Sequence, residues 1–281
     1  MKRVATLALC SSMLCAAGIV YYLKSNYMAK IQFDLGGNIH ETAKRSGAPK
    51  FATRNVAGLI SYKLLDLPPE IPATYQRLGY EITAIPLFAF TLYADTENNN
   101  DLAVETASLQ FSTNTLKSHE LAKAFVENLI GQFQRGQWKR FIHDLCPAVT
   151  GRSSLLDETG NLNQTLSCPL DPTYRLSMED WISMIGRTQD YQWLGDDVLA
   201  TLTVGFSNDI RGLTYSIRLE FQDFSIKNRR DSDRTLHVLA EGDAAGRHRT
   251  AKRAKELVEA RIRIKRLEEN AIERGDTVVP R

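Results

Sequence analysis

The chain has 281 residues, of which 43% are hydrophobic and 24% are charged, a composition typical of a globular protein of one or two domains. Its 35 Lys and Arg residues nearly balance 33 Asp and Glu residues, leaving a formal net charge of +2. This balance gives no electrostatic basis for binding nucleic acid, which needs a concentrated basic surface, so we expect no nucleic-acid partner.

The N-terminus carries the clearest localisation signal. After Lys2 and Arg3, residues 4–23 contain no charged side chain. About 20 apolar residues suffice to cross a bilayer as a helix, so the sequence predicts a cytoplasmic tail (1–3) and a transmembrane signal anchor (4–23). The same run also has the features of a cleaved signal peptide, which is the alternative. Either interpretation places the rest of the chain outside the cytoplasm, and we expect a single-pass inner-membrane protein with a periplasmic body.

Residues 24–79 show no sustained periodicity. Glycines interrupt the first half, and Pro68, Pro69 and Pro72 interrupt the second, where they prevent a continuing helix. We interpret this stretch as a juxtamembrane linker and irregular segment.

An α+β domain is predicted over residues 80–243, and it begins with strands. Two β-prone runs, 80–96 and 102–113, are separated by an Asn/Asp cluster, a pattern typical of a hairpin. Pro86 interrupts the first run, which is therefore expected to be an edge strand or to contain a bulge.

Two helices are expected next. Ser118 can cap the first, and apolar residues recur at three- and four-residue spacing over residues 121–133. A shorter helix over residues 138–145 is predicted to follow Gly136.

Cys146 and Cys168 lie outside the N-terminal segment. An even number of cysteines in an oxidising compartment favours a disulfide. The loop between them is rich in Gly, Ser, Thr and Asn, so the disulfide would hold a segment that is otherwise mobile. A metal site would need two more ligands at suitable spacing, and free thiols are the remaining alternative.

The second half of the domain is predicted to be a helix followed by a meander. The "SMED" stretch from Ser177 resembles a capping box. Residues 198–206 and 215–221 alternate apolar and polar side chains, as antiparallel strands with one wet face do. Residues 236–240 are a candidate third strand. The fold class is therefore α+β with an antiparallel sheet.

Residues 244–281 are predicted to form a long amphipathic helix and a tail, with Gly275 just beyond the helix end. From Arg247 to Asp276 there are ten basic and six acidic side chains, a local net charge of +4. The plainer interpretation is a solvated helix that packs on the domain by one narrow stripe, and the alternative, suggested by a short heptad seam, is a partner-binding or dimerising helix. The candidate surface residues are Arg253, Leu257, Arg261, Ile264 and Leu267.

Motifs for catalysis are missing from the sequence. "HETAK" (from His40) and "HELAK" (from His119) resemble the start of a zinc-protease motif, but each has lysine where the second histidine ligand is needed. Nucleophile elbows and phosphate-binding glycine loops do not occur. We therefore assign no catalytic residue, cofactor or metal site.

The sequence best fits a non-enzymatic binding or assembly module of the cell envelope. It could belong to an envelope or secretion machine, or act as an inhibitor of the immunity type. The expected partners are envelope proteins, the inner membrane through residues 4–23, and a second copy of the chain through the C-terminal helix. The alternative is an exported hydrolase with a site around Arg152, Ser153 and His143.

Overall fold

A computed structural model describes residues 30–96, 101–162, 168–186, 188–210, 212–229, 232 and 244–280. The predicted tail and anchor (1–23) and the candidate strand at 236–240 lie outside these ranges. In the described ranges, no helix is both long enough and apolar enough to cross a bilayer.

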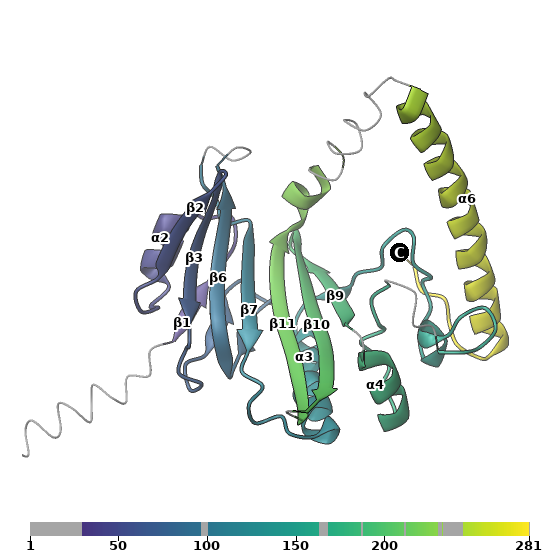
Figure 1. The fold of residues 1–281 in the computed structure, drawn as a ribbon, viewed down its shortest axis with the longest axis horizontal. Coiled ribbons are helices and arrows are strands. Elements are labelled where there is room, and N and C mark those ends of the chain that lie inside the picture. The colour runs from purple at the N-terminus through teal and green to yellow at the C-terminus, as the bar shows by residue number, and fades with distance from the viewer. Residues whose placement is uncertain are drawn as a thin grey trace, which may run out of the picture.

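A large antiparallel sheet organises the body, as the sequence predicted (Figure 1). Its eight strands follow the order β2-β3-β6-β7-β11-β10-β9-β8. The strands are β2 (Ala52–Val56), β3 (Leu59–Leu65), β6 (Leu87–Asp95), β7 (Thr106–Phe111), β8 (Lys139–Arg140), β9 (Gln189–Gly195), β10 (Val198–Asp209) and β11 (Gly212–Asp223).

Both predicted hairpins are confirmed. Strands β6 and β7 pair antiparallel, and β10 pairs with β11 from Val198–Asp223 to Asp209–Gly212. The first strand is irregular next to Pro86, since the β6–β7 register shifts between Leu87 and Ala89, as at a bulge. Strand β6 is not an edge strand, however, since it lies between β3 and β7.

The structure corrects the interpretation of residues 24–79 as a linker. From Ile31 onward the chain is folded, and a second sheet has the order β1-β4-β5. Tyr75 and Ile39 of this region are fully buried. Within residues 24–79 lie β1 (Ile31–Phe33), α2 (Ile39–Arg45), β2, β3 and β4 (Ala73–Tyr75), and β5 (Ile82–Ala84) follows. The three strands of the small sheet are too short to show a period in the sequence.

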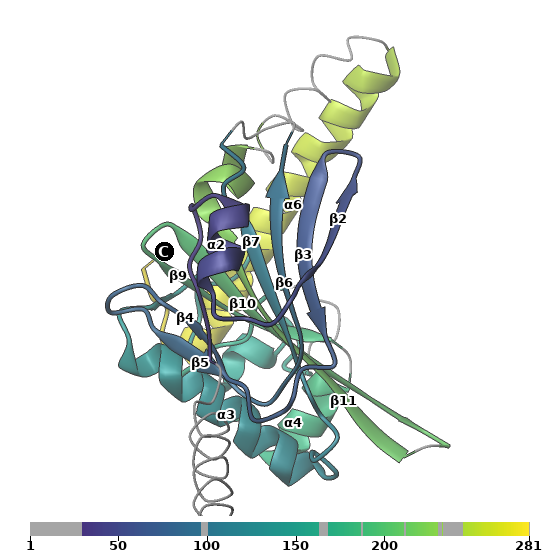
Figure 2. The same ribbon diagram turned by 90° about the vertical axis from the view of Figure 1, so that its left-hand side faces the viewer.

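Two helices and an aromatic core complete the body. Helices α3 (His119–Arg135) and α4 (Met178–Ile185) have the predicted caps, Ser118 and Ser177. Phe133 of α3 stacks on Trp193 of β9 with ring centroids 3.9 Å apart. Tyr75 of the small sheet stacks on Phe221 of β11 at 4.5 Å. In Figure 2, α3 runs across the lower end of the large sheet.

The prediction of a short helix after Gly136 is wrong. Trp138 is buried between Phe133 and Tyr80, and the next two residues form β8, which pairs with β9. Burial of the indole ring and pairing with the sheet outweigh the local helical pattern.

Candidate functional site

The predicted disulfide is confirmed. Cys146 and Cys168 are bonded, with their Cα atoms 5.6 Å apart. We call residues 146–168 the clipped loop. It contains a short 3-10 helix, η1 (Arg152–Leu155), and a bridge between Leu156 and Leu162. A structural disulfide is typical of a protein that folds in an oxidising compartment, which indicates an extracytoplasmic location.

The clipped loop is the platform on which the C-terminal helix rests. Helix α6 (Ala244–Glu273) packs against η1, and the tail after it runs back along the loop through a bridge between Val149 and Val278. Several hydrogen bonds join the clipped loop to the helix or the tail, among them those from Ala148 N to Glu268 Oε1 (3.0 Å), Val279 N to Ala148 O (2.7 Å), Thr150 N to Thr277 O (2.9 Å) and Ser153 N to Asp276 Oδ2 (2.9 Å).

A buried carboxylate, Asp171, holds the clipped loop at Gly151. The Asp171 side chain is inaccessible to solvent and lies 3.5 Å from the guanidinium of Arg140. Its Oδ2 accepts a hydrogen bond from the backbone N–H of Gly151, and its Oδ1 accepts two from Thr173. Asp171 therefore ties the clipped loop to the segment that leads into α4.

A second ion pair joins the clipped loop to α4. Asp180, whose side chain is 3% exposed, accepts hydrogen bonds from Arg152 Nε (3.2 Å) and Nη2 (3.0 Å). Burial alone would raise the pKa of the Asp180 carboxyl, but the hydrogen bonds and positive charge of Arg152 outweigh burial and hold that pKa below its usual range. The guanidinium of Arg152 therefore has a structural role, joining the clipped loop to α4.

We predict that the Asp180–Arg152 pair contributes stability only while Asp180 is ionised. Because the folded-state pKa is depressed, the contribution is present above the unfolded-state pKa of about 3.9 and is lost as the pH falls through the lower folded-state pKa. Urea unfolding of the wild type and Asp180→Asn should differ most near neutral pH, and the difference should shrink towards pH values of about 2. A difference that does not change with pH would contradict this assignment.

The residues of the hydrolase alternative do not form a catalytic group in this structure. The Ser153 hydroxyl is buried and has no hydrogen-bond partner among the described residues, so none of these residues is placed to activate it as a general base. His143 is exposed, and its Nδ1 accepts a hydrogen bond from the backbone of Leu145. Arg152 is held by Asp180.

The two histidines of the zinc-like motifs are hydrogen-bonded to tyrosines. His40 Nδ1 lies 2.5 Å from the Tyr62 hydroxyl, and His119 Nδ1 lies 2.6 Å from that of Tyr215. Within the described ranges, no group of three or more His, Cys, Asp or Glu side chains is arranged to hold a metal ion.

Helix α6 divides the predicted partner surface into two parts. Ile264 and Leu267 are 5% and 4% exposed, because this half of the helix packs on the body. Arg253, Leu257 and Arg261 are exposed. In both views the N-terminal end of α6 extends beyond the ends of the strands (Figures 1 and 2). We call residues 252–263 the projecting half of α6; all but the partly buried Ala260 are exposed.

Charge is also divided along α6. The projecting half has five basic and two acidic side chains, a net charge of +3, whereas residues 264–276 have a net charge of −1. Lys252 and Lys255 lie within 4.0 Å of Glu256 and Glu259, one turn further along. Among the basic residues of the projecting half, Arg253, Arg261 and Arg263 form no ion pair with any other described residue.

Comparisons with protein-family models, curated proteins and solved structures find no match to this chain.

Proposed function

We propose that this chain is a non-enzymatic binding or assembly module of the cell envelope, whose projecting half of α6 docks a protein partner. Residues 4–23 would anchor it in the inner membrane with its body in the periplasm. The anchor is supported by the length of the uncharged run, and the compartment by the disulfide.

One observation carries the proposal: a 30-residue helix is packed on its own body along only part of its length. The apolar heptad positions of α6 include Leu267 and Ile264, which are buried, and one heptad before Ile264 they include Leu257, which is exposed. Isolated helical segments are marginal in water, and most helix stability comes from packing an apolar face. A partner that covers Leu257 would complete this packing.

The charges around Leu257 indicate the chemistry of the partner. Arg253 and Arg261 are four residues before and after Leu257, so all three lie on one side of the helix. Neither arginine forms an ion pair within the described part of the chain. A protein surface with an apolar contact flanked by carboxylates would complement them. Such a partner fits an envelope or secretion machine, and equally an inhibitor that captures an incoming protein.

The test is site-specific photo-crosslinking in intact cells. A photoreactive residue at Leu257 should give a discrete adduct, whereas the same residue at Val56, which is 67% exposed on β2, should not. Arg261→Glu should lower the adduct yield several-fold, because it reverses a charge beside Leu257. Arg263→Glu is the matched control, since it makes the same charge change on another side of the helix.

The mass of the adduct identifies the partner. An adduct of twice the chain mass would make the partner a second copy, and another mass would make it a different protein. The proposal fails if Leu257 gives no adduct or if the two charge reversals reduce the yield equally.

A further inference from the structure

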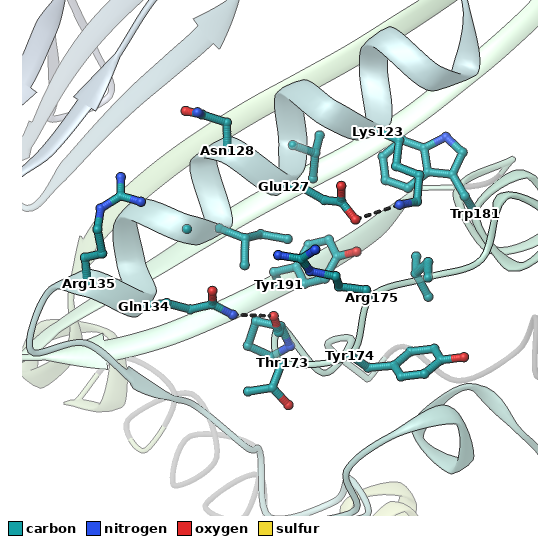
Figure 3. Close-up of a pocket in the computed structure, with 15 residues that line it drawn as sticks. Lys123, Glu127, Asn128, Gln134, Arg135, Thr173, Tyr174, Arg175, Trp181 and Tyr191 are labelled. Carbon is teal, nitrogen blue, oxygen red and sulfur yellow. Dashed lines mark hydrogen bonds and ion pairs between the residues drawn. The ribbon is translucent and has the colours of Figure 1, made fainter.

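A pocket of about 420 Å³ lies between α3 and residues 172–176, far along the chain from α6 (Figure 3). This is within the size range of small-ligand sites. Trp181 and Tyr191, which are 1% and 2% exposed, line its base. Val126 and Ile130 add an apolar wall from α3. The pocket therefore has an aromatic and apolar interior.

Residues 172–176, which form the wall opposite α3, are held by hydrogen bonds and burial. Gln134 Nε2 of α3 donates a hydrogen bond to the Pro172 carbonyl at 2.9 Å, which joins the two sides of the pocket. Asp171 accepts from the backbone and hydroxyl of Thr173, and Leu176 is buried. Arg175 is thus presented from a backbone fixed on both sides. Such preorganisation reduces the entropy lost when a ligand binds.

The rim carries more positive charge than negative. Lys123 lies 2.6 Å from Glu127, so these two side chains neutralise each other. Arg135 and Arg175 also line the pocket, and neither forms an ion pair with a described residue. Arg135 lies in the last turn of α3, where the helix dipole favours a cation, but Arg175 has no such compensation. Figure 3 shows the Arg175 guanidinium over the pocket near Tyr191.

Tyr191 adds a neutral donor. Burial raises the pKa of its hydroxyl, and the negative charges of Glu127 and Asp171 raise it further, so the group stays protonated. The hydroxyl makes no hydrogen bond to another described residue and can donate to an acceptor in the pocket.

We infer that this pocket binds a carboxylate attached to an apolar group. Arginines pair with carboxylates through two parallel hydrogen bonds, and the aromatic base would receive the apolar group. The aromatic and apolar interior favours a carboxylate that carries an apolar group over inorganic phosphate, which has no apolar part to bury. Two sources share this chemistry, a free organic acid and the C-terminus of a peptide.

Titration calorimetry of the full chain tests the inference. The probes are 3-phenylpropionate, the peptide N-acetyl-Ala-Ala-Phe with a free C-terminus, and the same peptide as its C-terminal amide. We expect saturable binding of at least one free carboxylate and none of the amide. Arg175→Gln combined with Arg135→Gln should weaken binding at least about tenfold, because hydrogen bonds to charged groups are lost.

Arg54→Gln, an exposed arginine on β2, is the matched control and should leave the affinity unchanged. Thermal unfolding of each variant checks its fold. Tighter binding of the free-acid peptide than of 3-phenylpropionate identifies the ligand as a chain terminus, and similar affinities identify it as a small acid. The inference is overturned if neither carboxylate binds at about 10 mM, if the amide or inorganic phosphate binds equally well, or if the double variant matches the Arg54→Gln protein. None of these results depends on α6, so they are separate from the test of the proposed function.

Discussion

Asp171→Ala should lower the free energy of unfolding by about 3–5 kcal/mol, because it removes one partner of a buried ion pair. Arg140, whose side chain is 14% exposed, would lose its carboxylate. The backbone N–H groups of Gly151 and Thr173 would also lose their acceptor. Denaturant unfolding monitored by circular dichroism measures the loss.

Asp157→Ala is the control for this effect. Asp157 makes the same kind of local network, accepting from the backbone and hydroxyl of Thr159 and from the backbone of Asn161. It has no cation partner in the described ranges and lies at the surface, so its loss should cost far less. Equal losses for the two variants would mean that the turn hydrogen bonds, and not the buried charge, determine the stability at Asp171.

The parts of the fold that the sequence predicted correctly are those with a local signal. Helices α3 and α4 have serine caps and an apolar stripe, and β10 and β11 alternate apolar and polar side chains over many residues. The Cys146–Cys168 disulfide followed from the number of cysteines and the expected compartment. In each case the residues that determine the structure are close in sequence or few in number.

The elements that the sequence missed depend on distant contacts. Strands β1, β4 and β5 have three residues each, which is too short for a period, and they are ordered by packing on the large sheet. Trp138 fits a helical pattern locally, yet its ring fills a space between Phe133 and Tyr80. Strand β9 did have a weak signal, since Tyr191 and Trp193 alternate with polar residues.

The candidate sites also depend on contacts between residues that are distant in the sequence. The apolar heptad positions of α6 could be predicted from the sequence. The change from exposed positions before Ala260 to buried positions after it could not, because the clipped loop that packs on the buried half lies more than 100 residues earlier in the chain. The pocket was not predicted at all. Arg135 and Arg175 are 40 residues apart in the sequence, and both line the pocket because α3 lies against residues 172–176, to which Gln134 is hydrogen-bonded.

The platform makes the orientation of α6 depend on the disulfide. The C-terminal half of α6 packs against η1, and η1 lies inside the clipped loop. The bonds from Ala148 and Ser153 to Glu268 and Asp276 hold only if the loop keeps its shape. Loosening the loop should therefore release α6 while leaving the large sheet intact, because the sheet strands lie outside the loop.

Replacing both Cys146 and Cys168 with alanine tests this dependence. The loss of the cross-link should lower the free energy of unfolding by about 3 kcal/mol, mainly because the unfolded chain gains freedom. Hydrogen exchange should speed up first in residues 264–271 of α6, where Ile264 and Leu267 are buried, and least in β10 and β11. Reduction of the wild type should reproduce this pattern, and an Ile272→Ala protein, changed at a residue that is 61% exposed on the same helix, should not. If exchange in α6 stays as slow as in the wild type, the helix is held by contacts that do not need the disulfide.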